Sequence, residues 1–90
     1  MKSVHVLISG KVQGVFFRAN TKQEAEKRHV SGWVRNTSDG KVEAVFQGDA
    51  SAVDDLINWC YQGSSASNVT NVSVEDVDVD ESFDGFTIRY

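Results

Sequence analysis

The sequence contains no proline and a single cysteine, Cys60, among its 90 residues. One cysteine excludes a disulfide within the chain and a zinc site built from cysteines. No apolar run approaches the roughly 20 residues that a helix needs to cross a bilayer. Met1 to Ser3 lead directly into a short alternating segment rather than into a signal peptide. The sequence therefore predicts a cytoplasmic protein that does not bind a membrane.

Basic residues are too few to balance the acidic ones, and the net charge is −4. Acidic side chains are concentrated near the end of the chain: Glu75, Asp76, Asp78, Asp80, Glu81 and Asp84. Such a field disfavours nucleic acid as a partner. With 40% hydrophobic residues the composition is that of an ordinary globular chain, and the length predicts a single domain over residues 1–90.

The first half of the chain contains the patterns of three strands and a helix. Val4, Val6 and Ile8 recur at every second position, which is typical of a strand with one buried side. Strong helix formers follow from Phe17 to His29, although Thr21 and Glu24 could form a capping box that starts this helix later. The segment "GWVRNTSDGKVEAVFQG" predicts two strands joined by a hairpin, because Asp-Gly is a strong hairpin signal.

The second half predicts another helix and two strands. Between Asp49 and Gly63, apolar residues follow the helical spacing i, i+3, i+4, i+7, with Asp49 or Ser51 as the cap. The apolar positions are Val53, Leu56, Ile57 and Cys60, which predicts a core role for the cysteine. Valines 72, 74, 77 and 79 then alternate with a change of phase between Glu75 and Asp76, which predicts one strand with a bulge. Residues 86–90 predict a last short strand.

This order predicts an α+β protein with the ferredoxin-like α/β sandwich, βαββαβ plus a short terminal strand. Crossover handedness places its two helices on one face of a mainly antiparallel sheet. Because that fold carries many functions, the function has to come from a site.

The stretch "GKVQGVFFRAN", from Gly10 to Asn20, connects the first strand to the first helix. Backbone N–H groups in a glycine-containing loop that ends at a helix start can converge on an anion, and the helix dipole favours negative charge there. Arg18, in the first helical turn, would add a planar fork for two phosphate oxygens. A strand–glycine–helix turn with a solvated arginine is also common, so this spacing alone leaves both interpretations open.

"GKVQGVFFR" followed by "GWVRNTSDGKVE" resembles the two signature stretches of the acylphosphatase family, and the resemblance extends to the closing "FTIRY". It implies hydrolysis of the carboxyl–phosphate anhydride of acyl phosphates to a carboxylate and inorganic phosphate, without a metal, a cofactor or a covalent intermediate. It also implies a phosphate-binding loop of Gln13, Gly14, Val15, Phe16, Phe17 and Arg18, with Arg18 binding the phosphate and Asn36 holding the attacking water. We expect a monomer that acts on a small acyl phosphate and is inhibited competitively by inorganic phosphate.

The residues themselves agree with these roles. In the second strand, Val34 and Asn36 share one face, so Asn36 lies on the helix side if Val34 packs beneath the helices. An amide there can orient water without deprotonating it, and neither signature stretch offers a convincing general base, which leaves a substrate phosphate oxygen as the proton acceptor.

Two other classes of function stay open. A ferredoxin-like module could bind single-stranded RNA through aromatic residues on its open sheet face, although Trp33 and Arg35 would lie there in an acidic field. A regulatory protein could have kept the phosphate loop and lost turnover, which the intact Asn36 argues against. An assay of acyl-phosphate hydrolysis would separate these hypotheses.

Overall fold

The computed structural model describes residues 1–78 and 82–90, and within these ranges the chain forms five strands and two helices. In chain order they are β1 (Lys2–Lys11), α1 (Phe17–Lys27), β2 (Ser31–Asn36), β3 (Val42–Gly48), α2 (Ala50–Gln62), β4 (Asn68–Asp76) and β5 (Phe86–Arg89). The hairpin predicted around Asp39-Gly40 is the connection between β2 and β3.

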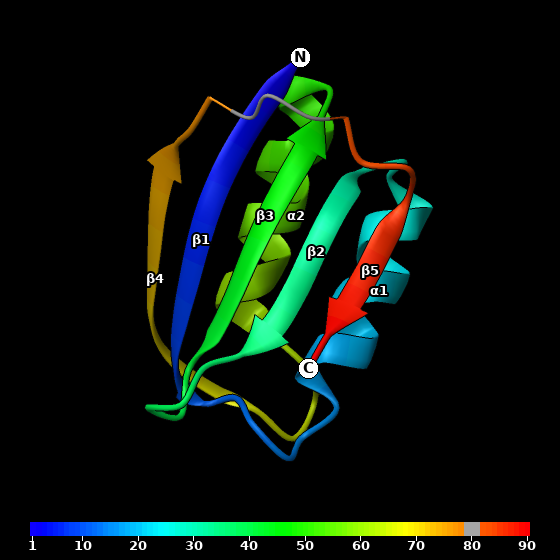
Figure 1. The fold of residues 1–90 in the computed structure, drawn as a ribbon. Coiled ribbons are helices and arrows are strands. Elements are labelled where there is room, and N and C mark those ends of the chain that lie inside the picture. Colours follow the sequence, from blue (N-terminus) through cyan, green and yellow to red (C-terminus); the bar gives the residue numbers. More distant parts are fainter. Residues whose placement is uncertain (79–81) are drawn as a thin grey trace.

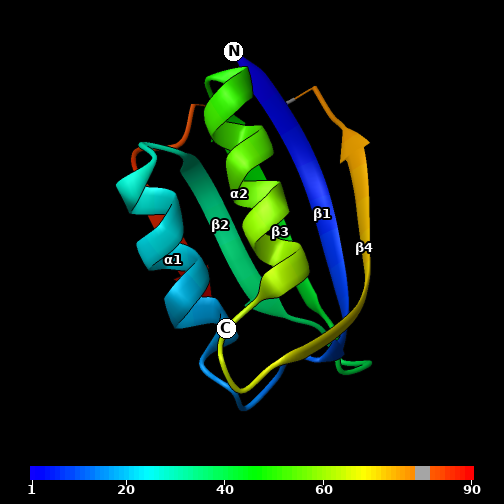
Figure 2. The ribbon, with the colours of Figure 1, turned by 180° about the vertical axis from the view of Figure 1, so that it is seen from behind.

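The strands form one sheet in the order β4-β1-β3-β2-β5. β1 pairs antiparallel with both β3 and β4, β2 pairs antiparallel with β3, and only the edge strand β5 runs parallel to its neighbour, β2. Both helices cover the same face of the sheet, and the other face carries no helix (Figures 1 and 2). The predicted ferredoxin-like arrangement with a short terminal strand is confirmed.

The core lies between the helices and the sheet. Alternate residues of β1 point into it, and Val4, Val6 and Ile8 are fully buried as their spacing predicts. The apolar stripe of α2 packs against them and includes Cys60, which is also fully buried. Burial raises the pKa of the Cys60 thiol to about 12, so this cysteine is an inert core residue rather than a nucleophile.

Helix α1 is shorter than the sequence predicts, because it ends at Lys27 and not at His29. His29 has a φ of 56°, in the left-handed region, and its N–H donates to the Glu26 carbonyl. The N–H of Val30 donates to the Ala25 carbonyl, which completes a Schellman-type helix end. Residues that favour a helix continue to the end of α1, so helix propensity alone does not predict the left-handed residue at which the chain turns.

The start of α1 also differs from one alternative that the sequence offers. A later helix start is wrong, because α1 begins at Phe17 and the Thr21 hydroxyl donates to the Phe17 carbonyl instead of capping the helix.

The bulge in β4 lies at a different place from the one predicted. Residues on both sides of the expected phase change, Glu75 and Asp76, pair in register with His5 and Val4. The register shifts instead between Ser9 and Gly10 of β1, which pair with positions 71 and 69, so Thr70 is the extra residue. The strand ends at Asp76, so the predicted continuation through Val77 is wrong, and Val79 lies outside the described residues.

Candidate active site

The loop between β1 and α1 begins the site. Gly14 and Phe16 both have positive φ angles, 73° and 61°, and Phe16 occupies the N-cap position of α1. No side chain caps this helix start by a hydrogen bond, and its first turn contains no acidic residue. The first N–H groups of a helix have no partner within the helix. The start of α1 is therefore suited to an anion, which those N–H groups and the helix dipole attract.

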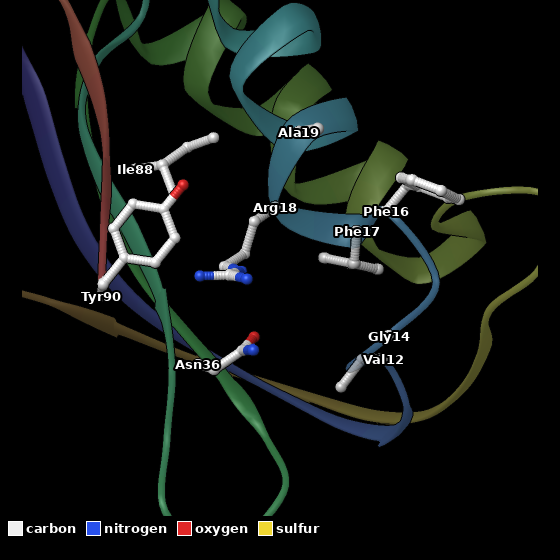
Figure 3. A pocket seen from close by; sticks show the side chains of 9 residues that line it. All are labelled: Val12, Gly14, Phe16, Phe17, Arg18, Ala19, Asn36, Ile88 and Tyr90. Carbon is white, nitrogen blue, oxygen red and sulfur yellow. The ribbon is translucent and has the colours of Figure 1, made fainter.

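Arg18 and Asn36 reach this loop from different elements. Arg18 lies in the first turn of α1, whereas Asn36 is the last residue of β2, and both side chains point into one cavity (Figure 3). The cavity has a volume of about 300 Å³. Its lining consists of Val12, Gly14, Phe16, Phe17, Arg18, Ala19, Asn36, Ile88 and Tyr90. The sequence prediction that Asn36 shares the helix-side face with the fully buried Val34 is confirmed.

The amide oxygen of Asn36 has an unusual environment. Oδ1 is buried, yet it accepts no hydrogen bond from any residue in the described part of the chain. Buried polar atoms nearly always have a partner, so an unpaired acceptor at a cavity needs an explanation. A small donor in the cavity, such as a water molecule, would supply the missing hydrogen bond.

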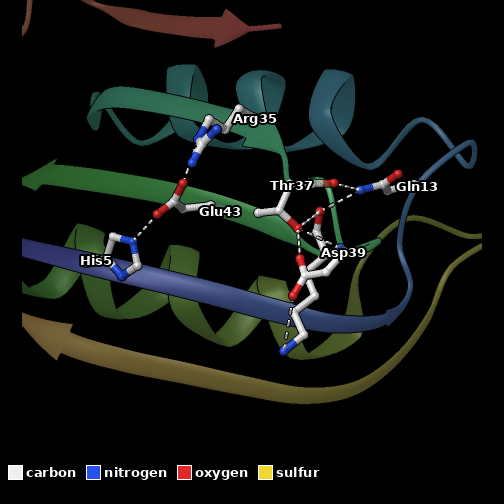
Figure 4. A network of polar contacts seen from close by, with 7 residues as sticks. His5, Gln13, Arg35, Thr37, Asp39 and Glu43 are labelled. Atoms are coloured by element: carbon white, nitrogen blue, oxygen red, sulfur yellow. Dashed lines mark hydrogen bonds and ion pairs between the residues drawn. The ribbon is translucent and has the colours of Figure 1, made fainter.

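Two residues of the predicted phosphate loop, Gln13 and Val15, do not line the cavity. The Gln13 amide instead donates hydrogen bonds of 2.8 Å to the carbonyls of Thr37 and Lys41 in the β2–β3 hairpin (Figure 4). Val15 is buried in the core. The side chain of Gln13 thus attaches the loop to the hairpin that carries Asn36, while the residues between and after these two face the cavity.

Sequence reasoning did not identify Ile88 and Tyr90 as part of the site. They are two positions apart in the closing segment, which puts them on the same face of an extended chain. This spacing can be recognised in the sequence, but it places the two residues at the cavity only because β5 pairs parallel with β2. The guanidinium carbon of Arg18 lies 4.9 Å from the centroid of the Tyr90 ring.

The sheet face without helices carries a separate polar network. Glu43 on β3 accepts hydrogen bonds from His5 Nε2 at 2.6 Å and from Arg35 Nε at 2.5 Å (Figure 4). The hydrogen bond from His5, together with the one from Arg35, lowers the pKa of Glu43 below its ordinary value. On the same strand as Arg35, the ring of Trp33 lies 4.5 Å from the guanidinium carbon of Arg89. Trp33, Arg35 and Arg89 each contact a partner from the chain itself, which weakens the RNA-binding hypothesis.

Within 1–78 and 82–90, no group of three His, Cys, Asp or Glu side chains is arranged to hold a metal ion. None of the helices found there is long and apolar enough to cross a membrane. The cavity at the start of α1, which brings Arg18 and Asn36 together, is the candidate active site.

Comparison with known proteins agrees with this geometry. The family model described as "Acylphosphatase" matches residues 4–88. Among curated relatives, an acylphosphatase from Haloquadratum walsbyi is 56% identical over 94% of this chain and 90% of its own length. Another from Rubrobacter xylanophilus is 51% identical over 98% of this chain and 80% of its own. The crystal structure of acylphosphatase from Bacillus subtilis superposes with a TM-score of 0.96 at 37% identity, with complete coverage of both chains. The chain belongs to the acylphosphatase family.

Proposed function

We propose that this acylphosphatase hydrolyses the carboxyl–phosphate anhydride of acyl phosphates with two residues in separate roles. Arg18 and the backbone of the 13–18 loop bind the phosphate, and Asn36 orients the water that attacks it. The products are a carboxylate and inorganic phosphate. The observation that carries this proposal is the unpaired, buried Oδ1 of Asn36 in the same cavity as Arg18.

Phosphate binding requires positive charge and N–H donors directed at one point. Arg18 supplies a planar, permanently charged fork that can bind two phosphate oxygens at once. The uncapped start of α1 supplies backbone N–H groups and the positive end of the helix dipole. The absence of an acidic residue from the first turn of α1 means that no carboxylate there opposes the phosphate.

Asn36 can orient a nucleophile because an amide oxygen accepts a hydrogen bond from water without deprotonating it. Holding water in line with the anhydride converts a random encounter into a positioned attack. No side chain that lines the cavity, in the part of the chain that the structure describes, is a carboxylate or an imidazole. The proton of the attacking water therefore passes to a phosphate oxygen of the substrate, the P–O bond to the carboxylate breaks, and the carboxylate leaves with the bonding electron pair.

The same proposal covers the partners of the enzyme. We propose that the monomer is the active unit. Inorganic phosphate carries the same charged group that the loop and Arg18 bind, so we expect it to inhibit competitively. We also expect activity without a metal ion or cofactor, and a cytoplasmic location.

The test is hydrolysis of acetyl phosphate and benzoyl phosphate by the purified chain, measured with and without a chelator and with added inorganic phosphate. We expect turnover that the chelator leaves unchanged and that phosphate inhibits competitively. Binding of phosphate without turnover would instead favour the regulatory protein that lost catalysis. Loss of turnover in chelator would contradict the metal-free mechanism.

A further inference from the structure

The carbonyl of Val15, in the middle of the phosphate loop, is held by a side chain from a distant part of the chain. The Ser64 hydroxyl donates a hydrogen bond of 2.8 Å to the Val15 carbonyl oxygen, although 49 positions separate the two residues. Both residues are buried, with 5% of Ser64 and 6% of Val15 exposed. Water cannot readily replace a hydrogen bond in such a place, so removal of the hydroxyl would leave a buried acceptor with one partner fewer.

This hydrogen bond fixes the direction of the next N–H group. In a planar trans peptide, the carbonyl of one residue and the N–H of the next point in opposite directions. The described residues contain no cis peptide bond, so this rule applies to the peptide between Val15 and Phe16. In Figure 3, the segment that follows α2, coloured yellow, lies beyond Phe16 on the side away from Arg18 and Asn36. Neither Val15 nor Ser64 lines the cavity, so their hydrogen bond holds the carbonyl away from the cavity and directs the Phe16 N–H, on the opposite side of the peptide, toward it.

The loop has a conformational reason to adopt the opposite orientation. Phe16 has φ 61° and ψ 21°, in the left-handed region that residues with a side chain adopt at a cost. Rotating the Val15–Phe16 peptide by half a turn would return φ of Phe16 to negative values. It would also point the carbonyl oxygen of Val15 into the cavity, where it would repel a phosphate. The hydrogen bond from Ser64 opposes this rotation.

The segment that carries Ser64 can approach the loop this closely because Gly63 precedes it. A Cβ at position 63 would lie 2.9 Å from Cε2 of Phe17 and would also collide with the Ser67 hydroxyl. Phe17, the first residue of α1, in turn packs on Trp59 of α2 with ring centroids 5.4 Å apart. The end of α2 and the start of α1 thus form one packed unit around the Val15 carbonyl.

We propose that Ser64 is a positioning residue of the phosphate loop, which holds the Val15–Phe16 peptide in the orientation that offers its N–H to the substrate phosphate. Ser64 lies outside the cavity and does not touch the substrate. This inference rests on the proposed binding of phosphate by the 13–18 loop. The segment after α2 thereby has a role in catalysis, although it lies outside both signature stretches.

The test compares Ser64→Ala with Ser67→Ala in the full chain. Ser67 lies in the same segment, and its hydroxyl donates to the Ser64 carbonyl, so the control removes a hydroxyl without touching the loop. Three quantities are measured for each protein: the inhibition constant of inorganic phosphate, kcat and KM for acetyl phosphate, and the amide NMR resonance of Phe16 during titration with phosphate. Removal of one such positioning bond is expected to raise the inhibition constant and lower kcat/KM by about tenfold in Ser64→Ala.

In the wild type and in Ser67→Ala, the Phe16 resonance should shift as phosphate binds, whereas in Ser64→Ala the shift should be reduced or lost. Ser64→Thr, which keeps the hydroxyl, should restore phosphate affinity. If Ser64→Ala does not fold, Ser64→Cys carries the test, because a thiol is a weak donor of similar size and should weaken phosphate binding in a folded protein. Equal phosphate affinity and equal Phe16 shifts in the Ser64 and Ser67 variants would overturn the inference. Failure of the wild-type chain to bind phosphate would instead contradict the proposed function.

Discussion

The guanidinium of Arg18 lies against the ring of Tyr90, with 4.9 Å between the guanidinium carbon and the ring centroid. Arg18 comes from the first turn of α1, and Tyr90 follows the edge strand β5, so the contact joins two parts of the fold at the cavity. A cation above an aromatic face is attracted by the ring quadrupole. The contact thereby restrains the arginine that we propose to bind phosphate.

Replacing Tyr90 with Ala should weaken phosphate binding modestly. The side chain is almost fully exposed, and an exposed cation–π contact contributes about 0.5–1 kcal/mol, so the inhibition constant of phosphate should rise about two- to fivefold. Tyr90→Phe keeps the ring and serves as the control. Equal losses in the two variants would show that the hydroxyl, and not the ring, is the important group.

Arg18→Lys should be almost inactive although it keeps the charge. A lysine ammonium is a point charge and cannot reproduce a planar fork with two parallel hydrogen bonds. We expect kcat/KM for acetyl phosphate to fall by at least the amount that follows loss of one oxyanion donor, roughly 3 kcal/mol. Lys22→Arg, on the same helix but outside the cavity, is a control for general effects of changing a cation. Near-normal turnover in Arg18→Lys would refute the role of Arg18.

His29→Gly should stabilise the protein. His29 holds φ 56° at the end of α1, where glycine is the usual residue because it has no Cβ to strain the left-handed conformation. The gain should be about 1 kcal/mol, which corresponds to a rise in Tm of roughly 4–8 °C for a domain of this size. Thermal unfolding followed by circular dichroism measures it, with His5→Gly as a control at a strand position where glycine should destabilise. A lower Tm for His29→Gly would mean that the imidazole itself supports this turn.

The network around Glu43 should contribute to stability in a pH-dependent way. Hydrogen bonds from His5 and Arg35 lower the pKa of Glu43 below its ordinary value, so the folded protein favours the ionised carboxylate. Its contribution is therefore complete above the unfolded pKa and is lost as the pH falls through the lower, folded pKa. Glu43→Gln should cost about 1 kcal/mol at pH 7, and the difference from wild type should shrink toward about pH 3. Urea unfolding at the two pH values tests this, and a difference that does not change with pH would contradict it.

The sequence predicts those parts of this fold that local signals determine. The stripe of α2, the Asp39-Gly40 hairpin and the face of Asn36 all follow from spacing within a few residues. The bulge at Thr70 depends on pairing with β1, and the position of Tyr90 depends on the parallel pairing of β5 with β2. The bond from Ser64 to Val15 crosses 49 positions. Such features arise from packing between distant segments, which propensity and periodicity do not encode.

Asn36→Ala should abolish most turnover while phosphate binding stays close to that of the wild type. Asn36 ends β2, whereas the proposed phosphate site lies in the loop before α1 and in its first turn. The Oδ1 atom of Asn36 has no partner among the described residues, so truncation breaks no hydrogen bond of the folded protein at that atom. An interaction that orients only the nucleophile acts in the transition state, and its loss should lower kcat far more than it raises the inhibition constant of phosphate.

Arg18→Ala provides the contrast, because it should impair both kcat and phosphate binding. Initial rates with acetyl phosphate give kcat, and calorimetry with inorganic phosphate gives the binding constant for each variant. If Asn36→Ala loses phosphate affinity in step with its rate, Asn36 belongs to the phosphate site and does not orient water. If it keeps its rate, the attacking water needs no anchor at that position. Only a loss of rate with retained affinity is consistent with two residues that meet in one cavity and act on different reactants.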